Sequence, residues 1–80
     1  MKIYDFNGQK NLCGKRVKEA RKKQKISQSM LAARLQVLGV NLERDSISRI
    51  EIGDRFVADY ELAAICKALE VSPSYLLGFE

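Results

Sequence analysis

Apolar residues recur at helical spacing after the first 13 positions of the chain. Within residues 14–25, Val17 and Ala20 lie three positions apart with charged residues around them, which is typical of one face of an amphipathic helix. Residues 1–13 show no such period, so they are predicted to form an N-terminal arm with a short extended piece at Ile3–Phe6.

A second helix is predicted to begin after Ser27, whose hydroxyl can accept hydrogen bonds from the first free amides of that helix. Gly39 is suited to its end, because glycine readily adopts the left-handed conformation that often follows a helix. The apolar face of this helix contains Leu31, Leu35 and Leu38.

Three more helices follow in the pattern. One covers residues 43–52 and is stopped by Gly53, a longer one covers residues 59–70, and a Ser-Pro step at 72–73 begins a short last helix. The connections are short and no internal repeat or second domain is evident. The sequence therefore predicts an all-α, five-helix domain over residues 14–80.

The composition narrows the function classes. Eighty residues, 46% of them hydrophobic, suffice for one small packed domain. The absence of histidine, of a Gly-rich phosphate loop and of metal-ligand spacing argues against an enzyme, a metal site or a cofactor. Cys13 and Cys66 are far apart and are expected to be reduced, mostly buried thiols. With no apolar run of membrane-spanning length, we expect a soluble cytoplasmic protein with no membrane partner.

Charge is unevenly distributed along the chain. Residues 1–53 carry twelve Lys/Arg and five Asp/Glu, which gives +7, whereas residues 54–80 carry two and five, which gives −3. A polyanionic partner would meet the first two-thirds of the chain. The asymmetry is weak evidence by itself, because a lysine-rich helix face is commonly just solvated.

The predicted third helix has two distinct faces. With about 100° per residue, Ile47, Ile50 and Glu51 fall on one side. The other side and its edges carry Asp45, Ser48, Arg49 and Ile52, with Ser46 at the flank and Arg44 at the N-terminal end. Such a polar face is either an ordinary solvated surface or a probe for the DNA major groove, which admits one helix.

Several ordered motifs carry a family resemblance. They read SQSMLAARL at 27–35, then a glycine turn, SISRIEIGDR at 46–55, and YELAAICKALEVSPSYLLG at 60–78. Over about residues 13–78 the chain closely resembles the helix-turn-helix regulators of the Cro/phage-repressor (XRE) type. The resemblance implies a lambda-repressor-like fold in which helices two and three form the helix-turn-helix. It also implies binding of double-stranded operator DNA, usually as a homodimer, with the third helix in the major groove.

The resemblance also implies roles for individual residues. Gln28 matches the glutamine that grips a phosphate at the start of the second helix. Arg21 and Glu51 match a partly buried structural ion pair between helices one and three. The residues that match base-reading positions, or line the same outward face, are Arg44, Asp45, Ser46, Ser48 and Arg49. Asp45 would either accept from a cytosine amino group or steer a neighbouring arginine.

The chain departs from the family pattern between helices two and three. The interval from Ser27 to Ile47 is about five residues longer than usual, so either the second helix is longer by a turn or the connection is longer. The cap of the third helix is then open: Asn41 is the better capping residue, while Glu43 occupies the usual cap position.

A second departure follows the third helix. The loop there is usually basic, but here it begins with Asp54, so Arg55 is the one remaining candidate for a phosphate contact in it. Ile52 is expected near the exposed side, either packed on this loop or available to a thymine methyl group.

The two ends of the chain leave alternatives open. The C-terminal residues Tyr75, Leu76, Leu77 and Phe79 either close the monomer core or form a dimer contact, with Phe79 the best candidate for a partner. In the arm, Lys2 and Lys10 could enter a minor groove, although disorder is expected there.

The sequence therefore favours a sequence-specific, dimeric DNA-binding regulator, most simply a repressor from a bacterium or prophage that binds a palindromic operator. The alternative is an antitoxin-like or protein-sequestering module that binds a protein partner through its C-terminal apolar patch.

Overall fold

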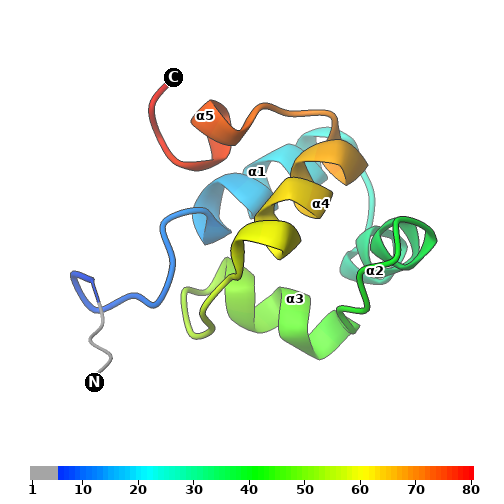
Figure 1. Ribbon diagram of the computed structural model, residues 1–80, viewed down its shortest axis with the longest axis horizontal. Coiled ribbons are helices and arrows are strands. Elements are labelled where there is room, and N and C mark those ends of the chain that lie inside the picture. The colour runs from blue at the N-terminus through cyan, green and yellow to red at the C-terminus, as the bar shows by residue number, and fades with distance from the viewer. Residues whose placement is uncertain (1–5) are drawn as a thin grey trace.

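A computed structural model describes residues 6–80 and contains five helices in this part of the chain (Figure 1). They are α1 (Gly14–Lys23), α2 (Gln28–Val37), α3 (Arg44–Glu51), α4 (Asp59–Leu69) and α5 (Pro73–Leu76). The predicted all-α, five-helix domain is confirmed. None of these helices is long and apolar enough to cross a membrane. Lys2 and nearly all of the extended piece predicted at Ile3–Phe6 lie outside the described residues.

The core forms where the helices converge. α1 packs against α3, α4 and α5, while α2 packs against α3 and α4. The largest fully buried side chains come from all five helices and are Val17, Leu31, Leu35, Ile47, Ile50, Ile65, Leu69 and Leu76. Burial of each such aliphatic side chain contributes about 1.5–3 kcal/mol, so these contacts account for much of the stability of so small a domain.

Leu38 is an exception to the predicted apolar face of the second helix. α2 ends at Val37, and the side chain of Leu38 is 44% exposed. Gly39 follows with φ +84°, and its amide donates to the carbonyl of Gln36 at 3.0 Å. The glycine signal for the end of the helix was therefore correct. The predicted apolar face of the second helix included one residue too many, because Leu38 already lies in the turn that caps α2.

The interval between Ser27 and Ile47 contains all of α2 and a connection before α3. Six residues, 38–43, link α2 to α3, and buried Leu42 anchors this link to the core. Glu43 is the N-cap residue of α3, but its side chain makes no capping hydrogen bond. Asn41, the alternative cap, lies in the connection and is exposed.

The last residues of the predicted arm pack against the helical domain. Cys13 is buried in the core, and the amide of Lys10 donates to the carbonyl of Gly53 at 2.8 Å. Gln9 covers Gly53, where an added Cβ would lie 3.1 Å from the Gln9 side chain. Residues 9–13 therefore belong to the folded domain and lie against the end of α3.

Candidate nucleic-acid interface

The outward face of α3 is polar and open. Its inward residues Ile47, Ile50 and Glu51 are buried, which fixes the rotation of the helix about its axis. On the other side Arg44, Asp45 and Arg49 are exposed, whereas Ser46 and Ser48 are partly buried. The structure thus places the five candidate base-reading residues on one accessible helix.

The structure also brings together Arg21 and Glu51. Arg21 Nε donates to Glu51 Oε2 at 2.7 Å, and Arg21 Nη2 donates to Glu51 Oε1 at 3.0 Å. Arg21 Nη1 donates to the carbonyl of Ile26 at 2.9 Å, so this buried guanidinium is well satisfied. The hydrogen bonds to Glu51 raise the pKa of Arg21, and the guanidinium therefore stays charged.

Gln28 lies beside this pair rather than pointing freely outward. Its Nε2 donates to Glu51 Oε1 at 3.1 Å, which joins the first residue of α2 to the last residue of α3. An amide nitrogen carries two hydrogens, so a second one remains for the phosphate contact that the resemblance implied. Gln28 is thus both a support for Glu51 and a candidate contact.

A Schellman motif ends α3. Gly53, at φ +82°, donates its amide to the carbonyl of Ile50 at 3.0 Å, and the amide of Asp54 donates to the carbonyl of Arg49 at 2.8 Å. The motif needs a left-handed residue, which explains the glycine at this position.

Asn11 fastens this end of α3 to the start of α1. Its Nδ2 donates to the carbonyls of Ile50 at 3.1 Å and Arg55 at 2.8 Å, and its Oδ1 accepts from the amide of Gly14 at 2.7 Å. An added Cβ on Gly14 would lie 2.0 Å from the Ile50 carbonyl oxygen. Asn11 was not among the residues predicted for the site. A short polar residue three positions before a helix start was the available signal.

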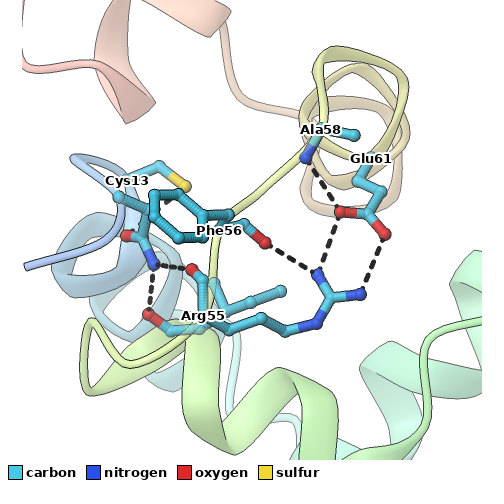
Figure 2. A network of polar contacts seen from close by, with 7 residues as sticks. Cys13, Arg55, Phe56, Ala58 and Glu61 are labelled. Atoms are coloured by element: carbon cyan, nitrogen blue, oxygen red, sulfur yellow. Dashed lines mark hydrogen bonds and ion pairs between the residues drawn. The ribbon is translucent and has the colours of Figure 1, made fainter. Parts of the chain in front are cut away.

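Arg55 is bonded to Glu61 of α4. Its Nη1 and Nη2 donate to the two carboxylate oxygens of Glu61 at 3.0 and 3.1 Å, and Nη1 also donates to the carbonyl of Phe56 (Figure 2). Glu61 Oε1 accepts from the amide of Ala58 at 2.9 Å as well. The bonds from Arg55 are the main cause of a lowered pKa at Glu61. Nε and the second hydrogen of Nη2 are not used in these bonds, so the predicted phosphate contact of Arg55 stays a prediction.

The exposure of side chains bears on two questions that the sequence left open, the packing of Ile52 and the role of the C-terminal apolar residues. Ile52 is 67% exposed, so it does not pack on the following loop as one alternative proposed. At the C-terminus Leu76 is buried and closes the core, whereas Phe79 is 77% exposed. The ring of Tyr75 lies under the guanidinium of Arg16, 5.1 Å from its centroid. Tyr75 and Leu77 are partly buried, so Phe79 is the most exposed of the four C-terminal apolar residues.

The cysteines are free, buried thiols, as expected. Burial raises the pKa of Cys13 to about 11 and raises the pKa of Cys66, so both stay protonated near neutral pH. No group of metal-ligating side chains occurs within residues 6–80.

Comparisons with known proteins agree with this geometry. A protein-family model described as Helix-turn-helix matches residues 17–76. The P22 c2 repressor, whose structure was solved in complex with a synthetic operator, matches with a TM-score of 0.72 and 36% identity, over 88% of this chain and 98% of that one. The restriction-modification controller protein C.AhdI from Aeromonas hydrophila matches with a TM-score of 0.69 and 28% identity, over 79% and 88%. No curated protein gives a significant match. The predicted resemblance and the lambda-repressor-like fold are thereby confirmed.

Proposed function

This chain belongs to the helix-turn-helix family of DNA-binding transcriptional regulators, and from that premise we propose that it recognises a specific operator with α3 in the major groove. One observation carries the proposal: α3 presents an accessible polar face while its other side is buried and braced by the Arg21–Glu51 pair. Such a helix reaches base edges without having to reorganise, because its axis and rotation are already fixed.

The side chains on this face suit base recognition. Arg44 and Arg49 carry the fork of donors that pairs with O6 and N7 of guanine, and each such contact is worth about 1–3 kcal/mol of discrimination. Asp45 can accept from a cytosine amino group. The small side chains of Ser46 and Ser48 allow the helix backbone to approach the bases, while Gln28 contacts a phosphate with its remaining amide hydrogen.

We further propose that the protein is a cytoplasmic repressor, without enzymatic activity, that binds as a two-fold dimer. A symmetric dimer would bind a palindromic site whose half-sites lie about 10 base pairs apart. Phe79 supports a partner contact, because covering a large aromatic side chain that is 77% exposed removes apolar surface from water and is favourable.

Selection from random DNA, followed by titration of the selected sequence, tests the proposal. We expect saturable binding that weakens steeply with salt. Arg49→Ala should abolish preference at one base-pair position, whereas Gln28→Ala should weaken binding about equally on all sequences. Lys67 is an exposed residue of α4, and Lys67→Ala is the control that removes a positive charge at a position outside α3. Tight operator binding after charge reversal at Arg44 and Arg49 would contradict the proposal.

A protein-interaction module is the second candidate function. It is favoured by the exposed aromatic side chains of Tyr60 and Phe79, which a protein partner would cover. A stoichiometric protein partner that co-purifies, together with DNA affinity that is indifferent to substitutions in α3, would favour this candidate over the operator-binding regulator.

A further inference from the structure

Asp54 lies between two cations at the C-terminal end of α3. Its Oδ2 is 3.7 Å from Arg49 Nε, and its Oδ1 is 3.9 Å from Lys10 Nζ. The side chains of Asp54 and Arg49 are each 58% exposed, so the group faces solvent beside the proposed DNA surface. A carboxylate here repels phosphates and lowers affinity for any DNA, which calls for an explanation.

The backbone fixes the position of Asp54 relative to Arg49. In the Schellman motif that ends α3, the amide of Asp54 donates to the carbonyl of Arg49 at 2.8 Å, and Gly53 supplies the left-handed turn between them. The carboxylate is therefore carried by the same rigid unit as the arginine. The backbone of Asp54 therefore keeps a fixed place relative to that of Arg49, from which its carboxylate reaches the guanidinium.

Lys10 completes the arrangement from the N-terminal segment. Its amide donates to the carbonyl of Gly53 at 2.8 Å, and its ammonium lies 6.0 Å from the centroid of the Phe56 ring. Lys10 and Arg49 together carry two positive charges against the one negative charge of Asp54. The group keeps a net charge of +1, so the acid can remain at a DNA-facing edge without preventing binding.

We infer that Asp54 is a specificity-determining residue that positions Arg49 for reading a base; this inference rests on the proposed DNA-binding function. Asp54 approaches the guanidinium at Nε, and within residues 6–80 neither Nη group makes a hydrogen bond. The two Nη groups are a suitable pair of donors for O6 and N7 of guanine. An arginine held in this way loses less conformational freedom on binding. It is also less available to phosphates, so the carboxylate favours the specific complex over non-specific ones.

Steering of a neighbouring arginine was one of the two roles predicted for Asp45. In residues 6–80 the acidic partner within ion-pair distance of Arg49 is Asp54, and Asp45 has no ion pair in the same part of the chain. Steering of Arg49 is thereby assigned to the loop, and Asp45 is left to accept hydrogen bonds from DNA.

The test is Asp54→Asn, which keeps the shape and removes the charge. The wild type and the variant are titrated with the selected operator, with its single base-pair variants and with non-specific DNA. Removal of the charge should tighten non-specific binding. Discrimination at the base pair read by Arg49 should fall by about 5-fold or more, compared with the roughly 5–150-fold that one good bidentate contact provides. Glu70→Gln removes an exposed acid after the far end of α4 and should leave discrimination unchanged.

A double-mutant comparison separates positioning from a general charge effect. In an Arg49→Ala background, Asp54→Asn should no longer change discrimination, although it should still tighten non-specific binding. Two outcomes would overturn the inference while the DNA-binding proposal stands. In one, Asp54→Asn leaves discrimination within about 2-fold of the wild type; in the other, discrimination falls equally with and without Arg49. Absence of any preferred sequence for the wild type would overturn both.

Discussion

Two buried glutamates are each paired with an arginine, one at the C-terminal end of its helix and the other at the N-terminal end. Glu51 is the last residue of α3, and Glu61 is in the first turn of α4. Both accept two hydrogen bonds from a guanidinium, at 2.7–3.0 Å from Arg21 and at 3.0–3.1 Å from Arg55. The Arg21–Glu51 side chains are 10% and 2% exposed, compared with 27% and 8% for Arg55–Glu61.

The helix dipole acts on these two carboxylates with opposite sign. Glu61 lies near the positive end of its own helix and also accepts from the Ala58 amide, so α4 itself stabilises the charge. Glu51 lies at the negative end of α3 and depends on residues from α1 and α2, namely Arg21 and Gln28. The Arg21–Glu51 pair, with Gln28, therefore joins three helices at an end of α3 where the helix dipole disfavours a carboxylate. The Arg55–Glu61 pair closes a loop at an end of α4 where the dipole favours one.

Removal of Arg21 should have the largest effect. We expect Arg21→Met to lower the free energy of unfolding by about 3–5 kcal/mol, because it leaves Glu51 buried without its cation. Urea denaturation measures the loss. Lys22→Met, on the exposed side of the same helix, should change stability by less than about 0.5 kcal/mol. A loss at Arg21 no larger than at Lys22 would mean that the pair does not hold α3 in place.

Removal of Arg55 should cost less. Arg55→Met should lower the free energy of unfolding by about 1–2 kcal/mol, because Glu61 keeps the Ala58 amide and the favourable helix end. The same denaturation series gives the value, with Lys67→Met on α4 as the matched control. If Arg55→Met proved as costly as Arg21→Met, the dipole explanation for the difference would be wrong.

The pH dependence of the contribution of Glu61 to stability is expected to be the smallest of these effects. Arg55 holds the pKa of Glu61 below its usual value of 4.5, so the folded state binds this proton less readily than the unfolded state does. The contribution of Glu61 is therefore present above about pH 4.5 and is lost as the pH falls through its lowered pKa. The stability difference between wild type and Glu61→Gln should shrink over that range. Unfolding measured at several pH values tests this, and a constant difference would show that Glu61 is not stabilised by its charge.

The helices themselves were largely predictable from the sequence, because their signals are local. Ser27 caps α2, Gly39 and Gly53 lie in left-handed turns, and Ser72 caps α5, each within a few residues of the helix end it defines. The spacing of buried Ile47 and Ile50 fixed the inward face of α3 and therefore its outward face. The Arg21–Glu51 pair was expected from the family resemblance rather than from spacing.

Tertiary structure decided which polar side chains meet. Arg55 bonds to Glu61, Asn11 reaches across 39 residues to Ile50, and Asp54 stands beside Arg49 with Lys10 beyond it. Local periodicity carries no such information, because a long polar side chain on an exposed face has many partners of similar energy until packing fixes the backbone around it. Sequence alone therefore determined the helices, most of their ends and the face that α3 turns outward. Packing alone determined which arginines remain free to meet a ligand and which are already bonded within the protein.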